Sequence, residues 1–212
     1  MERGHRPAIG ALLHFSPWSV MLESMKTEFE CRFTNIDMDA MRKKLRDLGF
    51  ELTQPEHLMR RKIFSLPDIG GARRWLRLRE QAGGATLTLK LKGAATNILS
   101  MKEVEVSVGD FALMGELLES AGHKCDSYEE NRREKWLKGG IEVCLDTWPG
   151  LAPFAEIESD SEENVRTAAA ELGFDWKDAM FKSVIEVYEK QGISMAGVHA
   201  SCTFENPPKA KK

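Results

Sequence analysis

Charged and apolar residues alternate with period two in at least six segments of the chain, and this alternation constrains the fold more than any other feature. Period two places successive side chains on opposite faces of a β-strand. The charged rows consist of Glu28, Glu30 and Arg32; Arg77 and Arg79; Thr86, Thr88, Lys90 and Lys92; Glu103 and Glu105; Glu142 and Asp146; and Glu156 and Glu158. The pattern predicts an antiparallel sheet with one apolar face and one face dominated by full charges.

Charges of the same sign recur two residues apart within these rows, where they repel each other. A single row of this kind is most simply a solvated strand face, and opposite charges on neighbouring strands can pair across a sheet. Six rows together are better explained by groups that bridge them, because a divalent metal bridges carboxylates and a phosphate bridges arginines and lysines. We therefore expect the charged rows to face a shared interior and the apolar rows to pack outside, beneath helices.

A strand with Glu-x-Glu, followed by an amphipathic helix and a glycine, occurs three times along the chain. The apolar spacing predicts helices near 37–48, 110–121 and 161–172. Asp37, Asp110 and Ser161 are candidate N-caps, and a glycine after each helix suits a left-handed C-terminal cap. These glycines are Gly49, Gly122 and Gly173.

Further strands are expected near 59–65, 74–80, 85–92 and 132–146, with hairpin turns at Gly83-Gly84 and Gly139-Gly140. The predicted class is α+β, with an antiparallel eight-stranded barrel that is closed or nearly closed and helices packed outside. A barrel of this size has room for side chains and one small ligand. We expect one domain over 26–192, a disordered extension over 1–25 and a disordered tail over 193–212.

Composition limits the partners of the chain. A net charge of −3 and a pI of about 6.0 argue against a dedicated nucleic-acid binder, and no run of 18 apolar residues predicts a membrane-spanning helix. The cysteines form no CxxC pair, which disfavours structural zinc and favours the reducing cytoplasm. Cys31 and Cys144 lie in apolar runs and are interpreted as core residues. The sequence leaves the oligomeric state open, and a homodimer would fit.

The charged rows resemble, in order, the motifs of the CYTH superfamily, also called triphosphate tunnel metalloenzymes. Glu28-x-Glu30-x-Arg32 is similar to the ExExK signature of that family, with Arg32 in place of the usual lysine. The resemblance extends through Trp75-Leu-Arg77-Leu-Arg79, Thr86-Leu-Thr88-Leu-Lys90, Glu103-Val-Glu105, Asn131-Arg132-Arg133, Glu142 to Asp146, Phe154-Ala-Glu156-Ile-Glu158 and Lys182-Ser183, and covers nearly all of 26–190. Segment 56–64 departs from it, since Arg60, Arg61 and Lys62 stand where the family commonly has an acidic residue.

This resemblance implies a small-molecule triphosphate as substrate and Mg²⁺ or Mn²⁺ as cofactor, since both cations prefer oxygen ligands. The implied metal ligands are Glu28, Glu30, Glu156 and Glu158, with Glu103, Glu105 and Asp146 available for a second metal or for orienting water. The implied triphosphate clamp consists of Arg32, Arg77, Arg79, Lys90, Lys182 and either Arg132 or Arg133, with Lys92 as a weaker candidate. The implied catalytic residues are Glu28, Glu30, Arg32 and Lys182.

Three functions fit such a site. We expect a triphosphatase that hydrolyses the terminal phosphate of inorganic, nucleoside or thiamine triphosphate. A class IV adenylyl cyclase, which makes cyclic AMP from ATP, would use the same clamp, and a non-catalytic triphosphate- or polyphosphate-binding protein would share the charges without turnover. No residue is recognisable as an adenine-specific contact, so the charged residues alone do not choose between hydrolase and cyclase.

Overall fold

The computed structural model describes residues 26–69, 71–92, 101–181, 183–193 and 201–208. Its strands are β1 (Lys26–Thr34), β2 (Glu51–Ile69), β3 (Ala72–Gln81), β4 (Gly84–Lys92), β5 (Met101–Val108), β6 (Ser127–Lys138), β7 (Ile141–Thr147), β8 (Phe154–Ser159) and β9 (Ser201–Cys202). Its helices are α2 (Met38–Asp47), α3 (Phe111–Ser120), α4 (Glu162–Glu171) and α5 (Val184–Lys190), with a short 3-10 helix η1 (Trp176–Asp178). The predicted α+β class is confirmed.

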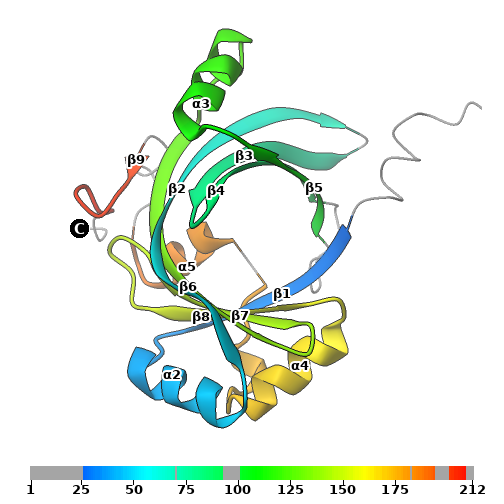
Figure 1. The fold of residues 1–212 in the computed structure, drawn as a ribbon, viewed down its shortest axis with the longest axis vertical. Helices are drawn as coiled ribbons and strands as arrows, with labels where there is room; N and C mark the ends of the chain where they lie inside the picture. The colour runs from blue at the N-terminus through cyan, green and yellow to red at the C-terminus, as the bar shows by residue number, and fades with distance from the viewer. Residues whose placement is uncertain (1–25, 70, 93–100, 182, 194–200, 209–212) are drawn as a thin grey trace, which may run out of the picture.

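The eight long strands form one curled antiparallel sheet in the order β2-β3-β4-β5-β1-β8-β7-β6. Strand β2 pairs with β3 and also with β6, from the Glu51–Leu137 pair to the Ile63–Ser127 pair. Strand β1 pairs with β8 over most of its length and with β5 only through residues 26–28. Figure 1 shows the strands curling around a central opening. The sheet therefore has a concave face that can collect side chains from many strands.

The threefold pattern of strand, helix and glycine is present as predicted, in β1 with α2, β5 with α3, and β8 with α4. The Asp110 carboxylate accepts a hydrogen bond from the Leu113 N–H at 2.8 Å, and Asp37 and Ser161 cap their helices in the same way. Gly49 follows α2 with a φ of +80°, where a side chain would be strained. The three capping signals in the sequence therefore mark the helix starts that they indicated.

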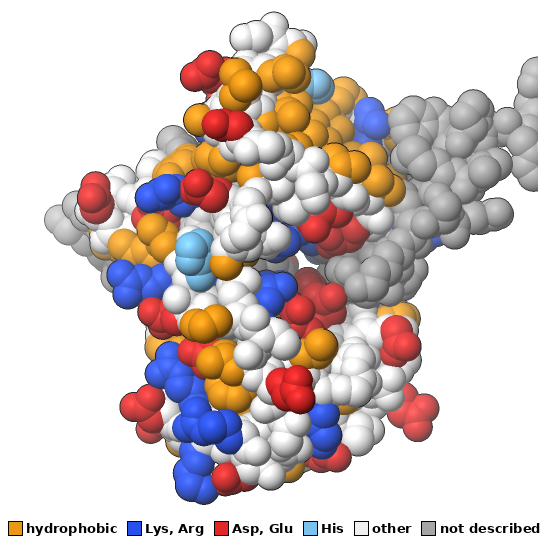
Figure 2. All heavy atoms as spheres, in the orientation of Figure 1, with side chains coloured by type: hydrophobic (Ala, Val, Ile, Leu, Met, Phe, Trp, Pro, Cys, Tyr) orange, Lys and Arg blue, Asp and Glu red, His pale blue; other side chains and the backbone are white. Residues whose placement is uncertain are grey.

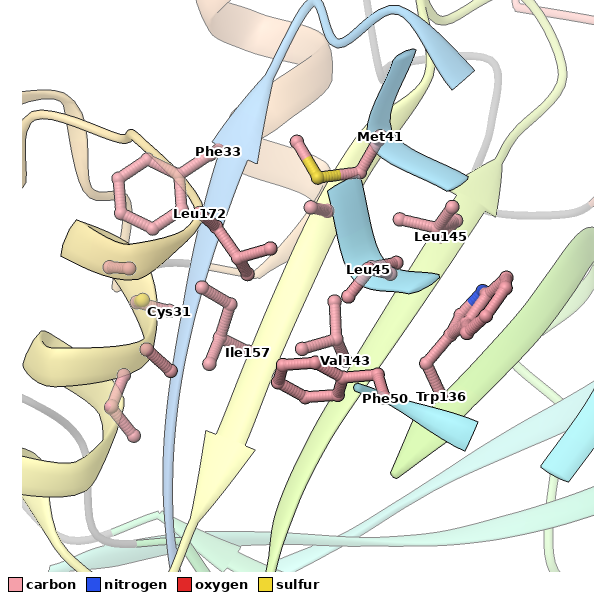
Figure 3. Close-up of a cluster of buried hydrophobic side chains, with 14 residues drawn as sticks. Cys31, Phe33, Met41, Leu45, Phe50, Trp136, Val143, Leu145, Ile157 and Leu172 are labelled. Carbon is pink, nitrogen blue, oxygen red and sulfur yellow. The ribbon is translucent and has the colours of Figure 1, made fainter. Parts of the chain in front are cut away.

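The convex face of β1, β7 and β8 packs beneath α2 and α4. Figure 3 shows this cluster, in which Cys31 and Phe33 of β1 and Ile157 of β8 meet Leu45 of α2 and Leu172 after α4. The Phe33 ring also stacks on Phe174 at a centroid distance of 4.1 Å. Because strand side chains alternate, this apolar packing turns the charged residues of the same strands toward the concave face.

Helix α3 covers less of the sheet than we expected. It packs against β3 and β4, and its Leu118 meets Leu78 of β3 and Phe64 of β2. Val104 and Val106 of β5 remain 39% and 53% exposed. Val108 at the end of β5 packs with the α3 cluster, so the prediction that apolar rows lie beneath helices is wrong only for Val104 and Val106 of this strand, which α3 does not reach.

Residues 201–208, which we expected in a disordered tail, pack against the sheet. Strand β9 pairs in parallel with β6, and the Cys202 side chain is buried. The Phe204 N–H donates to the Glu130 carboxylate at 3.1 Å. The predicted extension over 1–25 lies outside the described residues, as do 194–200 and 209–212.

No helix in the described part of the chain combines the length and hydropathy that crossing a membrane requires.

Candidate functional site

Strand pairing brings the predicted charged rows together on the concave face. Glu30 lies opposite Glu158 across the β1–β8 pair, and the next pair on that face joins Arg32 to Glu156. Other cross-strand pairs on this face are Lys90 with Glu103, Thr88 with Glu105 and Arg133 with Asp146. Figure 2 shows acidic and basic side chains around the central hollow of the molecule. The expected common face for the charges is therefore present.

Three carboxylates form an acidic cluster, defined here as Glu30, Glu156 and Glu158, whose nearest oxygens all lie within 4.8 Å of one another. Oxygen-only ligands at this spacing fit a hard divalent cation such as Mg²⁺ or Mn²⁺. The Arg32 guanidinium lies beside two of them, 3.0 Å from Glu30 and 2.5 Å from Glu156. The three carboxylates thus concentrate negative charge, and the Arg32 guanidinium balances part of it.

A buried network fixes one side of the acidic cluster. One Arg133 nitrogen lies 2.6 Å from Asp146 and 2.9 Å from Glu156. Asp146 is fully buried and also accepts a hydrogen bond from the Asn131 amide at 2.7 Å. Asp146, a predicted metal ligand, is placed by these contacts to hold Arg133, and it lies outside the acidic cluster.

The ionisation of Glu156 depends on these neighbours. Burial alone would raise its pKa, but the charges of Arg133 and Arg32 outweigh burial and hold the pKa of Glu156 well below its usual range. Against the effect of burial, the charges of Asp146 and Glu156 raise the pKa of Arg133, and those of Glu156 and Glu30 raise the pKa of Arg32. All three groups are therefore charged over the physiological range.

We expect acid to destabilise the protein through Glu156. Its pKa is lower in the folded state than in an unfolded chain, so its contribution to stability is complete above pH about 4.5 and is lost as the pH falls below that value. Glu156→Gln should cost about 3–5 kcal/mol at neutral pH, because Arg32 and Arg133 lose a buried partner. The variant should also lose less stability than wild type as the pH falls below about 4.5. Thermal unfolding followed by circular dichroism between pH 7 and 3 measures both effects, and an unchanged acid limb in the variant would contradict this account.

A cationic wall, defined as Arg77, Arg79 and Lys90, faces the acidic side chains of β5. Lys90 forms an ion pair with Glu103, while one Arg77 nitrogen lies 3.6 Å from Glu103 and 3.7 Å from Glu105. Arg79 lies 3.6 Å from Glu105, whose carboxylate accepts a 2.6 Å hydrogen bond from Thr88. The arginine contacts are longer than hydrogen bonds, so these guanidinium groups retain donor capacity.

The cationic wall carries more positive charge than its carboxylates balance. The Nε atoms of Arg77 and Arg79 are buried and have no hydrogen-bond partner among the described residues. Burial lowers the pKa of Arg79 to about 9, and the charges of Arg77 and Arg133 act in the same direction. Burial also lowers the pKa of Lys90, with Arg77 contributing. A surface with these properties would bind an anion well.

Sequence reasoning did not identify Arg61 as a site residue. Arg61 of β2 lies opposite Arg79 on the concave face and is only 9% exposed. It stands between Arg60 and Lys62, and three consecutive cations conceal the period-two signal. The alternation of Met59, Arg61 and Ile63 against Arg60 and Lys62 was the only signal available for it.

Other residues singled out in the sequence lie on different faces of the sheet or outside the described residues. Of the alternatives Arg132 and Arg133, the structure turns Arg133 inward, whereas Arg132 is half exposed on the convex side, 3.7 Å from Glu56. Cys144, interpreted as a core residue, is buried as expected; it lies on the concave face, where its thiol contacts Glu142 at 3.2 Å. The side chain of Glu28 and all of Lys182 lie outside the described residues. Lys92 is half buried near the end of β4.

An apolar cap, defined as Trp148, Phe154, Val187 and Tyr188, lies beside one end of the charged face. Phe154 shares the inward face of β8 with Glu156, and Trp148 follows the end of β7, two residues after Asp146. Both pack against Val187 and Tyr188 of α5. The Tyr188 hydroxyl donates to the Pro149 carbonyl at 2.7 Å. Helix α5 therefore fixes an apolar boundary at this end of the interior.

Comparison with known proteins gives this fold a family. The sequence model of the CYTH domain matches residues 26–180. No curated protein matches the chain. A solved structure of the PH1012 protein from Pyrococcus horikoshii is 21% identical with a TM-score of 0.62, over 75% of this chain and 98% of its own. A candidate adenylate cyclase from Vibrio parahaemolyticus is 17% identical with a TM-score of 0.63, over 78% of this chain and 99% of its own. At these identities the two structures support the fold alone.

Proposed function

This chain belongs to the CYTH domain family, and from that premise we propose that it is a metal-dependent triphosphatase that hydrolyses the terminal phosphate of a small triphosphate. One observation supports this most directly. The acidic cluster and the cationic wall lie on the same concave face, and each has the chemistry to bind one half of a metal–triphosphate complex. A solvated sheet face would give no reason for three buried guanidinium Nε atoms without partners.

We propose further that the curled sheet is the wall of a closed tunnel. Pairing of β2 with both β3 and β6 gives the strand order no free edge there. The short pairing of β1 with β5 joins the two halves of the order. Enclosure matters chemically because ion pairs and hydrogen bonds to phosphate strengthen when water is excluded.

In this proposal the chain's own residues do two things. Arg77, Arg79 and Lys90 bind and orient the phosphate oxygens, which positions the terminal phosphorus for attack by water. Glu30 and Glu158, with Glu156, would hold Mg²⁺ or Mn²⁺, which when bound would supply charge neutralisation of the phosphates. Arg133 and Arg32 keep Glu156 ionised, so the cluster retains its negative charge at neutral pH.

The alternative is an adenylyl cyclase, in which the ribose 3′-hydroxyl attacks the α-phosphate and diphosphate leaves. The fold is shared with a protein described as a candidate adenylate cyclase, and the phosphate clamp would serve either reaction. Hydrolysis is favoured here because the concave face is lined by charges on both sides. At the apolar cap, the Arg61 guanidinium already lies over the Trp148 ring, 4.6 Å from the ring centroid.

The proposal predicts orthophosphate release that depends on a divalent metal. Purified protein should be incubated with inorganic triphosphate, thiamine triphosphate or ATP, with Mg²⁺, Mn²⁺ or EDTA, and assayed for orthophosphate, diphosphate and cyclic AMP. We expect orthophosphate from at least one substrate and a loss of at least about 100-fold in EDTA. Cyclic AMP and diphosphate without orthophosphate would establish the cyclase instead. Tight binding of triphosphate without any product would establish a binding protein.

A further inference from the structure

Arg61 is a buried cation that the fold itself leaves unbalanced. Its guanidinium is held by a hydrogen bond to the Asn131 amide oxygen and by the Trp148 ring. Among the described residues no carboxylate lies within ion-pair distance of it, in contrast to Arg32 and Arg133 on the same face. Its Nε is buried and has no partner there. An unpaired buried charge is strongly unfavourable, so the structure retains Arg61 at a penalty that a bound anion would remove.

The surroundings of Arg61 reinforce this imbalance. Glu129 lies opposite Arg61 across the β2–β6 pair, and its charge partly offsets the effect of burial without forming an ion pair. On the β3 side the neighbour of Arg61 is Arg79, and the charges of Arg77 and Arg133 also act on it. Burial lowers the pKa of Arg61 to about 10, and these cations contribute in the same direction, although the group stays protonated at neutral pH. Several guanidinium groups thus converge beyond the cationic wall, on the side away from Lys90.

The position of Arg61 along the interior indicates which part of a substrate it meets. It lies against Trp148, so it stands at the apolar cap. On β8, Phe154 of the cap precedes Glu156 and Glu158, which places the acidic cluster farther from the cap. The Arg61 guanidinium lies over the Trp148 ring at this end, which leaves less apolar surface for an organic substituent.

We propose that Arg61 binds the terminal phosphate of the substrate and makes the site select a triphosphate over a diphosphate. The inference rests on the proposed function and deepens it. A triphosphate held by Arg77, Arg79 and Lys90 has one phosphate more than a diphosphate with which to reach the cap end. The terminal phosphate carries more negative charge than the inner phosphates of the triphosphate, and it has no ester group. It therefore suits a buried guanidinium whose Nε–H has no hydrogen-bond partner among the described residues.

The test compares Arg61→Gln with wild type by isothermal titration calorimetry in EDTA, where no turnover interferes. Glutamine removes the charge and keeps a donor for Asn131. We expect the affinity for inorganic triphosphate to fall by about 10- to 100-fold and that for inorganic diphosphate to change by less than about threefold. Arg61→Lys, which keeps the charge, should restore part of the preference. Arg60→Gln is the matched control, because Arg60 points outward, is half exposed and pairs with Glu80.

A second readout separates this role from a structural one. Without ligand, Arg61→Gln should unfold at the same temperature as wild type or higher, since it removes an unbalanced buried charge. An equal loss of affinity for triphosphate and diphosphate, or no loss for either, would overturn the inference while wild-type binding still supported the proposed function. A wild-type protein that binds no triphosphate would overturn both.

Discussion

Replacing Glu30 and Glu158 together by glutamine should lower metal-dependent triphosphate turnover by at least about 1,000-fold. Glutamine keeps the shape of each side chain and removes the charge that a divalent cation needs. Glu156 is left in place because Arg32 and Arg133 use it as a buried partner, so its loss would disturb the fold as well as the site. Glu30 also pairs with Arg32, but Arg32 keeps Glu156 as its other partner, so the double variant should disturb the fold less than the loss of Glu156 would.

The measurement is steady-state phosphate release over a range of Mg²⁺ and Mn²⁺ concentrations. Very high metal should rescue part of the activity, because one carboxylate of the cluster remains. A double variant of Glu163 and Glu189 to glutamine is the matched control, since both lie on exposed helix positions. Activity within about twofold of wild type in the site variant would show that the acidic cluster does not bind the metal.

Arg77→Gln with Arg79→Gln should weaken inorganic triphosphate binding by about 100- to 10,000-fold, the second largest effect we expect. Each guanidinium would lose charge-assisted hydrogen bonds to phosphate, at about 1.5–3 kcal/mol for each residue. Their contacts with Glu103 and Glu105 are long, at 3.6–3.7 Å, so the fold depends on them little. Stability of the free protein should change far less than affinity.

Calorimetry in EDTA measures this affinity, and Arg132→Gln provides a control with the same chemistry. Sequence motifs alone left Arg132 and Arg133 as equal candidates, whereas the structure turns only Arg133 inward. Arg132→Gln should therefore bind triphosphate as wild type does. If Arg132→Gln lost affinity while the Arg77 and Arg79 double variant did not, the triphosphate would bind to the convex face and the assignment of the concave face as the site would be wrong.

Much of this fold was predictable because its local signals are independent and agree. Period-two alternation fixed which side chains share a face on β1, β3, β4, β5, β7 and β8, and capping residues with glycines marked three helices. Agreement across levels of this kind is what makes a sequence specify one structure. The acidic cluster followed from the same argument, since Glu30 and Glu158 lie in alternating strands that pair directly.

The parts that were missed depend on information that alternation does not carry. On β2, consecutive cations at Arg60, Arg61 and Lys62 give no period, and only pairing with β3 and β6 decides which one faces inward. Tail residues near Cys202 read as polar and proline-rich, yet the edge of β6 gives them hydrogen-bond partners. Exposure of Val106 depends on the length and direction of α3, which no pattern in β5 encodes.

The most direct test of the central claim is a crystal structure of the protein with inorganic triphosphate and Mn²⁺, using the anomalous signal of manganese to locate the metal. The account predicts manganese beside Glu30, Glu156 and Glu158, with phosphate oxygens against Arg77 and Arg79 on the concave face. Triphosphate bound on the convex surface, or manganese away from those carboxylates while the concave face holds no ligand, would contradict it.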